Sequence, residues 1–129
     1  MIVVDCSAVV DVLLSAPGSG DVRRLLGGRE LHAPDLLDVE VVSALRGLVL
    51  GRHLSVERAS AALGDYDQLP VRRWPISHPF RTRMLSLRDR ATAYDAAYVA
   101  VAEALGCSLV TRDARLARAV DALVDVVLV

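Results

Sequence analysis

Short runs of β-branched residues alternate along this chain with longer segments in which apolar residues recur at helical spacing. The first run, Ile-Val-Val-Asp at residues 2–5, is typical of a buried parallel strand. The runs predicted as strands are residues 2–5, 30–33, 71–76, 108–111 and 125–129. The third contains two Arg, Trp74 and Pro75, which favours an extended segment at the edge of a sheet.

Helices are expected between these strands. The predicted ranges are 8–14, 21–26, 35–50, a helix opened by Ser55, 79–87, a helix from Thr92 or Tyr94 to Leu105, and 114–120. Ser7 is predicted to cap the first helix, and residues 16–20 to form a turn. The longest helix carries an apolar stripe at spacings of three and four: Leu37, Val41, Leu45, Leu48 and Val49.

This alternation predicts the α/β class, with a parallel sheet of about four or five short strands and helices on both faces. The 129 residues suit a single domain spanning 1–129, and 53% apolar residues allow a substantial core. No apolar run reaches membrane-spanning length, and the first residues lack the basic stretch of a targeting peptide, so the cytosol is the expected location. Cys6 and Cys107 are expected to be reduced core thiols.

The charge of the chain excludes a general basic nucleic-acid coat, because the formal net charge is −1. All 15 cationic residues are Arg, and Lys is absent. This absence argues against a receiver-like phospho-acceptor or a haloacid-type phosphatase, both of which use a Lys to hold the phosphoryl group. Such a Mg²⁺-dependent domain stays open as a weaker alternative.

Four acids map to one edge of the predicted sheet. Asp5 ends the first strand, and Asp113 lies just past the strand 108–111. Glu40 belongs to the helix entered from the second strand, and Asp95 begins a helix that leads back into the strand 108–111. Because sites form at the carboxyl ends of parallel strands, these four side chains are expected to converge.

Converging carboxylates repel one another unless a cation neutralises them, and Asp5 and Asp95 lie in apolar surroundings where an unpaired charge is costly. Mg²⁺, with Mn²⁺ as a substitute, suits an all-oxygen site and can activate a water. The alternatives are ordinary structural roles: a helix cap for Asp5, Asp95 or Asp113, and a solvated helix position for Glu40.

Four motifs in this order resemble the PIN-domain ribonucleases of the VapC toxin type. They are Val-Val-Asp5-Cys-Ser7, Glu40-Val-Val-Ser43-Ala-Leu45, Thr92-Ala-Tyr-Asp95-Ala-Ala-Tyr98, and Leu109-Val-Thr111-Arg-Asp113-Ala-Arg-Leu116. The resemblance runs from residue 3 to residue 116. It implies a PIN-like three-layer sandwich.

The resemblance also implies that Asp5, Glu40, Asp95 and Asp113 hold the metal and are catalytic, with Ser7 and Thr111 in support. Ser43 stands where the family often has Asn, so its supporting role departs from the pattern. Asp38 is a rival to Glu40, but only Glu40 fits the spacing to Ser43 and Leu45. Cys6 is expected to be a packed thiol.

The function that the resemblance implies is Mg²⁺-dependent endonucleolytic cleavage of RNA, with tRNA or ribosomal RNA as the expected substrate. The implied partners are a VapB-type antitoxin, whose C-terminal segment covers the active site, and a second copy of the chain. A homodimer, and a heterotetramer or larger assembly with the antitoxin, are expected. A non-catalytic PIN-like binding module is the other alternative, although the presence of all four acids favours catalysis.

Six Arg lie between residues 72 and 90, directly before the Asp95 helix. They are predicted to offer phosphate contacts to RNA, with Arg81, Arg83 and Arg88 as the candidates. A solvated helical face is the alternative for each of them. Trp74 could stack on a base, but packing is the simpler expectation.

Overall fold

The computed structural model describes residues 1–14 and 19–129. The strands are β1 (Ile2–Val4), β2 (Leu31–Pro34), β3 (Val71–Trp74), β4 (Ser108–Thr111) and β5 (Val126–Leu128). The helices are α1 (Cys6–Leu13), α2 (Ser19–Leu26), α3 (Leu37–Leu50), α4 (Val56–Asp67), α5 (His78–Ser86), α6 (Ala93–Leu105) and α7 (Ala114–Val120). Most of the turn predicted at residues 16–20 lies outside the described residues, and its last two positions begin α2.

The five strands form one parallel sheet in the order β3-β2-β1-β4-β5. The N-terminal strand β1 is therefore central, with Val3 aligned with His32 of β2 and Leu109 of β4. Every residue of β1 is buried, as expected for a strand covered on both faces. All five strands end at the same edge, and the segments that follow Val4 and Thr111 leave the sheet side by side there.

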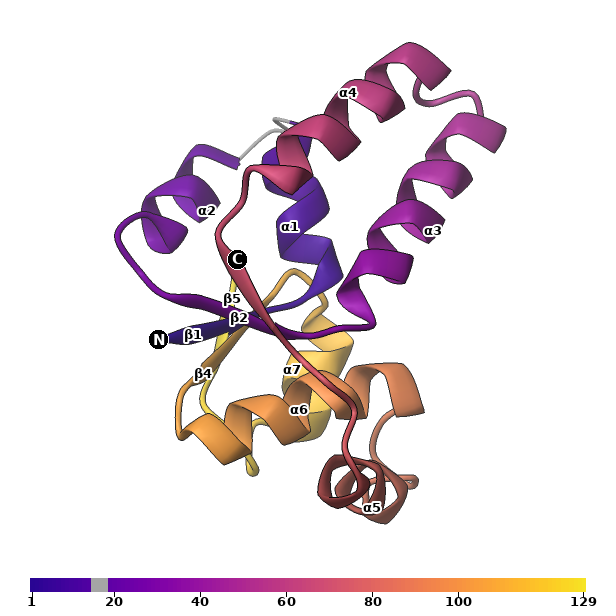
Figure 1. Cartoon of the computed structure of the whole chain (residues 1–129). Helices are drawn as coiled ribbons and strands as arrows, with labels where there is room; N and C mark the ends of the chain where they lie inside the picture. The colour runs from indigo at the N-terminus through magenta and orange to yellow at the C-terminus, as the bar shows by residue number, and fades with distance from the viewer. Residues whose placement is uncertain (15–18) are drawn as a thin grey trace.

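Helices cover both faces of the sheet. Figure 1 shows α1, α2, α3 and α4 on one side and α5, α6 and α7 on the other. On the first side α1 packs against α3, and on the second α6 packs against β1, β2 and β4. The predicted α/β class and the three-layer arrangement are confirmed.

The second face of the sheet is covered by a helix that is buried all round in its middle. Residues 96–102 of α6 are each no more than 2% exposed, and four of these seven residues are Ala. Small side chains let α6 lie close to the sheet on one side and to α5 on the other. Tyr98 is the one large polar side chain in this stretch, at 1% exposure.

One local expectation, the cap of α1, needs correction. Ser7 does not cap α1; the cap is Asp5, whose carboxylate accepts the Ala8 N–H at 3.0 Å. Asp and Ser side chains both accept hydrogen bonds from the free N–H groups at the start of a helix, and here Asp5 is the acceptor. Leu48 and Val49, at the outer end of the stripe in α3, are only partly buried, because α3 extends past the sheet toward α4.

The edge strand β3 is tied to β2 by side chains as well as by the ladder. The Trp74 indole N–H donates to His32 Nδ1 at 3.0 Å, which places the imidazole proton on Nε2. The Arg72 guanidinium lies over the indole ring, 4.8 Å from its centroid. Trp74 is therefore part of the packing of this edge, as the simpler expectation held. No helix among the described residues has the length and apolar character needed to cross a bilayer.

Leu109→Ala should destabilise the protein by about 2–5 kcal/mol, since Leu109 is 0% exposed on the strand beside β1 and its loss leaves a cavity. Leu50→Ala removes the same atoms from a side chain that is 65% exposed, and should stay within about 0.5 kcal/mol of the unaltered chain. Urea unfolding at equilibrium measures both. Equal effects of the two substitutions would contradict the placement of the core.

Candidate active site

The buried carboxylate of Asp5 lies directly after β1, with 7% exposure. Oδ1 accepts the Ser7 hydroxyl at 2.7 Å and the Ala8 N–H at 3.0 Å, and Oδ2 accepts the Thr111 hydroxyl at 2.5 Å. Burial raises the pKa of Asp5, the three hydrogen bonds offset part of that effect, and the charge of Asp113 raises it again. Asp5 is thus a restrained carboxylate whose negative charge is only partly compensated by the chain.

Two hydroxyl groups connect Asp5 to the segment that carries Asp113. Thr111 Oγ1 donates to Asp5 and accepts the Asp113 N–H at 3.0 Å. Ser7 Oγ donates to Asp5 and accepts the Arg112 N–H at 2.9 Å. These bonds cross from β1 and α1 to the end of β4, so the positions expected to support the site do contact it.

Asp113 itself is the N-cap of α7, the ordinary structural role that the sequence left open. Its Oδ1 accepts the N–H groups of Arg115 and Leu116 at 2.9 and 3.1 Å. Capping and a metal-site role are compatible, because a carboxylate has several lone pairs and both bonds end on one oxygen.

Asp95 lies in the first turn of α6, which is capped by Thr92. The Asp95 N–H donates to Thr92 Oγ1 at 3.2 Å, and this fixes the start of the helix at the site. Burial raises the pKa of the Asp95 carboxyl, Thr92 offsets part of the rise, Asp113 and Asp5 raise it further, and Arg115 lowers it.

Glu40 is held by a residue to which sequence analysis gave no role. The buried Tyr98 hydroxyl donates to Glu40 Oε1 at 2.8 Å, linking α6 to α3. Burial raises the pKa of Glu40, the Tyr98 bond offsets part of this, and Asp95 and Asp5 raise it further. Tyr98 follows Asp95 by three residues on α6 and so lies on the same face of the helix, a spacing that was visible in the sequence.

Asp38, the rival to Glu40, is engaged elsewhere. It accepts the Tyr66 hydroxyl at 2.6 Å and the Arg73 Nε–H at 2.8 Å. Burial alone would raise the pKa of Asp38, but these two partners outweigh it and the pKa is lowered. A carboxylate already paired with an arginine is a poor candidate for a cation site, so the geometry favours Glu40.

The side chains of Ser43 and Cys6 form no hydrogen bond with these carboxylates among the described residues. Ser43 is exposed on α3, one turn after Glu40, and its hydroxyl has no hydrogen bond among the described residues. Burial, with the charges of Glu40 and Asp5, raises the pKa of the Cys6 thiol to about 12, so it stays protonated as a packed thiol would.

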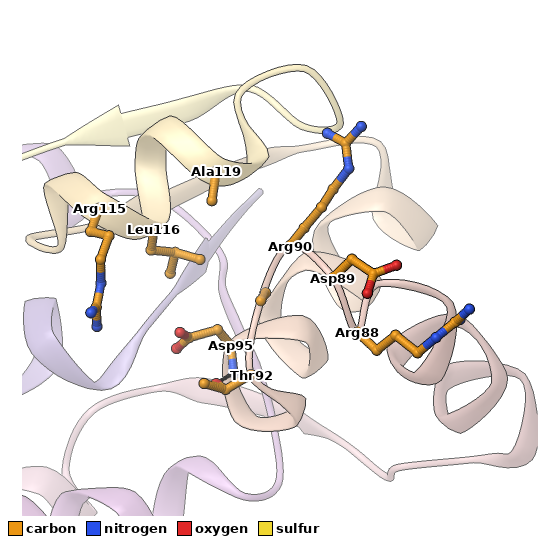
Figure 2. Close-up of a pocket in the computed structure, with 9 residues that line it drawn as sticks. Arg88, Asp89, Arg90, Thr92, Asp95, Arg115, Leu116 and Ala119 are labelled. Atoms are coloured by element: carbon orange, nitrogen blue, oxygen red, sulfur yellow. Dashed lines mark hydrogen bonds between the residues drawn. The ribbon is translucent and has the colours of Figure 1, made fainter.

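The three arginines predicted to contact RNA have different surroundings. Arg83 forms a two-pronged pair with Glu103, at 2.8 and 2.7 Å, which occupies its guanidinium. Arg81 donates to the Ile76 carbonyl at 2.5 Å. Arg88 lines a cavity beside Asp95, but its side chain points away from that carboxylate (Figure 2). Contact between these arginines and RNA stays a prediction.

The four acids fit a hard divalent cation by their chemistry. Asp5, Glu40, Asp95 and Asp113 supply only oxygen donors, and each of the first three has its pKa raised by at least one of the others. Among the described residues no three potential ligands come together closely enough to enclose a metal ion unaided. Mg²⁺ does not require such a cage, because it usually keeps several waters and binds one or two carboxylates together with substrate oxygens.

A protein-family model described as PIN domain matches residues 2–122. Ribonuclease VapC12 of Mycobacterium tuberculosis is 44% identical over 118 residues, which cover 92% of this chain and 91% of VapC12. Ribonuclease VapC1 of the same organism is 46% identical over 118 residues, covering 91% of this chain and 89% of VapC1. The chain belongs to the VapC ribonucleases of the PIN-domain family. VapC ribonucleases are toxins of toxin–antitoxin systems, so the resemblance drawn from the four motifs is confirmed.

Solved structures support the same fold for this VapC chain. VapC20 of Mycobacterium tuberculosis, a toxin that cleaves the sarcin-ricin loop, aligns with a TM-score of 0.69 at 18% identity, covering 92% of this chain and 95% of VapC20. FitAcB of Neisseria gonorrhoeae aligns with a TM-score of 0.68 at 19% identity, covering 98% and 96%. Membership of the VapC family favours a ribonuclease over the phospho-acceptor that the sequence left open.

Asp95→Asn should raise the melting temperature of the metal-free protein by a few degrees at neutral pH. Because the pKa of Asp95 is raised in the folded protein, keeping it ionised there costs stability at neutral pH. The unaltered protein should therefore gain stability as the pH falls through the raised pKa, and the advantage of the variant should shrink. Thermal unfolding at several pH values, with EDTA present, measures this.

Asp65→Asn is the matched control, because it makes the same change on an exposed acid of α4. It should leave the pH dependence of the melting temperature as it is in the unaltered chain. A lower melting temperature for Asp95→Asn than for the unaltered protein at neutral pH would show that the carboxylates do not repel one another as described.

Proposed function

We propose that this chain is a cytoplasmic endoribonuclease that uses Mg²⁺, or Mn²⁺ in its place, to hydrolyse RNA with an activated water. The carrying observation is the arrangement of the acids at one edge of the sheet. Thr111 joins Asp5 to the backbone of Asp113, Tyr98 of the Asp95 helix holds Glu40, and neighbouring acids raise the pKa of Asp5, Glu40 and Asp95. Repulsion between these carboxylates makes their ionised forms unfavourable without a cation, and a bound cation would relieve that repulsion. The matches to VapC ribonucleases over about nine tenths of the chain support this proposal.

Three hydroxyl-bearing residues would position the carboxylates for the cation. Ser7 and Thr111 hold both oxygens of Asp5 in place, and Tyr98 holds one oxygen of Glu40. These bonds fix the carboxylates before a cation arrives, which reduces the reorganisation needed on binding. Asp5, Glu40, Asp95 and Asp113 would hold a divalent ion, which would supply an activated water and stabilisation of the leaving oxygen.

The RNA target is expected to be tRNA or ribosomal RNA. VapC20, which shares the fold, cleaves the sarcin-ricin loop, an example of a ribosomal target for a relative. Sequencing the 5′ ends of RNA fragments after induction of the chain in cells would identify its own target and cleavage position.

RNA cleavage should need Mg²⁺ or Mn²⁺ and stop when EDTA is added. Glu40→Gln should lower the cleavage rate by about 100-fold or more, as should Asp5→Asn and Asp95→Asn, since each removes a charge that holds the cation. Initial rates on total cellular RNA, and then on the mapped fragment, measure the effect.

Asp38→Asn is the matched control for Glu40→Gln, because it neutralises an acid two residues earlier in the same helix that binds Tyr66 and Arg73 instead. It should keep the metal-dependent activity within a few-fold. Activity that survives Asp95→Asn, or that ignores EDTA, would overturn the metal mechanism. A folded chain that cleaves no RNA pool would favour the non-catalytic binding module.

The expected partners are a VapB-type antitoxin and a second copy of the chain. A groove of about 330 Å³ runs between α1 and α3, starts at Ser7 beside the active site, and has apolar walls that include Val10, Leu14, Ala44 and Leu48. An antitoxin segment that packs in this groove would end over the carboxylates and block them. Several apolar side chains of α3 and α4 are exposed, which suits further association.

Ala44→Glu should abolish complex formation with the antitoxin while leaving RNA cleavage intact, because it places a charge in the apolar groove. Arg46→Glu, an exposed change on the same helix, should leave the complex unaffected. Size-exclusion chromatography with light scattering, using the product of the adjacent reading frame, gives both the affinity effect and the stoichiometry. A heterotetramer or larger assembly is expected, and a complex that tolerates Ala44→Glu would exclude the groove.

A further inference from the structure

A second cavity, of about 400 Å³, lies beside Asp95 and shares no lining residue with the α1–α3 groove. It is lined by α7, by Asp95 of α6 and by residues 88–92, the segment that leads into α6 and includes the acid Asp89. Its floor is aliphatic, formed by Ala91, Leu116 and Ala119, and Leu116 is 4% exposed. The volume falls within the roughly 300–1,000 Å³ that small organic ligands occupy in proteins. Sequence analysis predicted RNA contact for Arg88, which lines this cavity, but gave no role to Arg115.

Two arginines stand at the ends of this aliphatic floor. Figure 2 shows Arg115 on the side toward which the Asp95 carboxylate points, and Arg90 at the opposite end, with Leu116 and Ala119 between them. Both guanidinium groups lie in exposed residues and make no hydrogen bond or ion pair among the described residues. Arg115 is near enough to Asp95 for its charge to lower the pKa of that carboxyl.

Several basic groups outside this cavity are already engaged. Arg73, Arg83 and Arg112 each form an ion pair, with Asp38, Glu103 and Asp11 respectively. The cavity beside Asp95 therefore combines unengaged positive charge with an apolar surface, next to the carboxylates proposed to hold the cation. An RNA nucleotide has the matching properties: a phosphate for the guanidinium, and an unstacked base and ribose for the aliphatic floor.

We propose that this cavity is a nucleotide subsite that takes the residue of a single-stranded RNA adjacent to the scissile phosphate. Arg115 holds a phosphate of that nucleotide, and Leu116 and Ala119 contact its base or ribose. This inference rests on the proposed ribonuclease function and extends it, since it makes Arg115 a positioning residue beside Asp95. A paired strand does not fit, because its bases are stacked inside the duplex and cannot enter the cavity.

The inference predicts a charge effect from Arg115→Ala and a volume effect from Ala119→Leu. Binding is measured by fluorescence anisotropy with labelled single-stranded RNA covering the mapped cleavage site, in the cleavage-deficient Asp5→Asn chain with Mg²⁺ present. Arg115→Ala should weaken binding about tenfold and reduce the slope of log K against log salt by about 0.7, the value of one lost phosphate contact to a single strand. Ala119→Leu should weaken binding without changing the salt slope.

Arg118→Ala is the matched control, because Arg118 is exposed on the same helix and does not line the cavity. It should leave the affinity within about twofold, and the salt slope within about 0.2, of the values for the Asp5→Asn reference chain. Arg115→Lys should restore most of the salt slope, since it restores the charge. Circular dichroism and the melting temperature confirm that each variant is folded.

A neutral methylphosphonate linkage locates the contact. Placed next to the cleavage site, it should weaken binding to the reference chain but add nothing to the loss in Arg115→Ala, because both remove the same interaction. The subsite would be excluded if the affinity losses from the methylphosphonate and from Arg115→Ala were additive, or if Arg115→Ala left the salt slope unchanged. The proposed ribonuclease function would still stand in that case, provided that the unaltered chain cleaves RNA. If Arg115→Ala lowered affinity for the protein partner and left RNA binding unchanged, the cavity would belong to that partner and the inference would fail.

Discussion

The buried charge of Asp5 at the end of the central strand is the constraint on which the site depends. Removing a carboxylate from water is costly, and the chain offsets the cost with bonds from Ser7, Ala8 and Thr111. The Thr111 bond exists only because β1 and β4 pair in parallel, in a register that brings their ends together. The pKa of Asp5 nevertheless stays raised, so the fold positions the charge without neutralising it. A cation can compensate the negative charge that the hydrogen bonds leave uncompensated. The topology of the sheet, which positions this charge, is thereby linked to the chemistry of the site.

The other acids of the site are also held in place by neutral hydroxyl groups rather than by charged partners. Thr111 bridges Asp5 and the backbone of Asp113, and Tyr98 fixes Glu40 from the buried face of α6. Neutral donors can orient a carboxylate without cancelling its charge, whereas an arginine partner would compete with the cation. Asp38 illustrates the contrast: hydrogen bonds from Tyr66 and Arg73, together with the charge of Arg73, lower its pKa despite burial, and the ion pair with Arg73 makes it a poor candidate ligand.

The gathering of the four acids at one edge could be predicted because it follows from strand order and direction, which short apolar runs and helix stops encode. The α/β class and all five strands were predicted for the same reason. The contacts of Tyr98 with Glu40 and of Arg83 with Glu103 were not predicted, because they join residues 58 and 20 positions apart, whereas a supporting role for Thr111 was expected from the family motif. Ser7 was predicted to cap α1, with a helix cap as an alternative role for Asp5, because propensity does not distinguish two polar residues so close in sequence; in the structure the cap is Asp5.

A net charge of −1 argues against a basic coat but says little about where positive charge is available. Ion pairing engages Arg73, Arg83 and Arg112, so these contribute less attraction to a phosphate than their number suggests. Arg90 and Arg115 form no ion pair among the described residues, and Arg115 lies beside Asp95, where a bound cation would add to its attraction for a substrate phosphate. If the proposed subsite binds RNA, affinity for the polyanion would be set by a few unpaired guanidinium groups at this edge of the sheet. A slightly acidic protein could then act on RNA without attracting it over its whole surface.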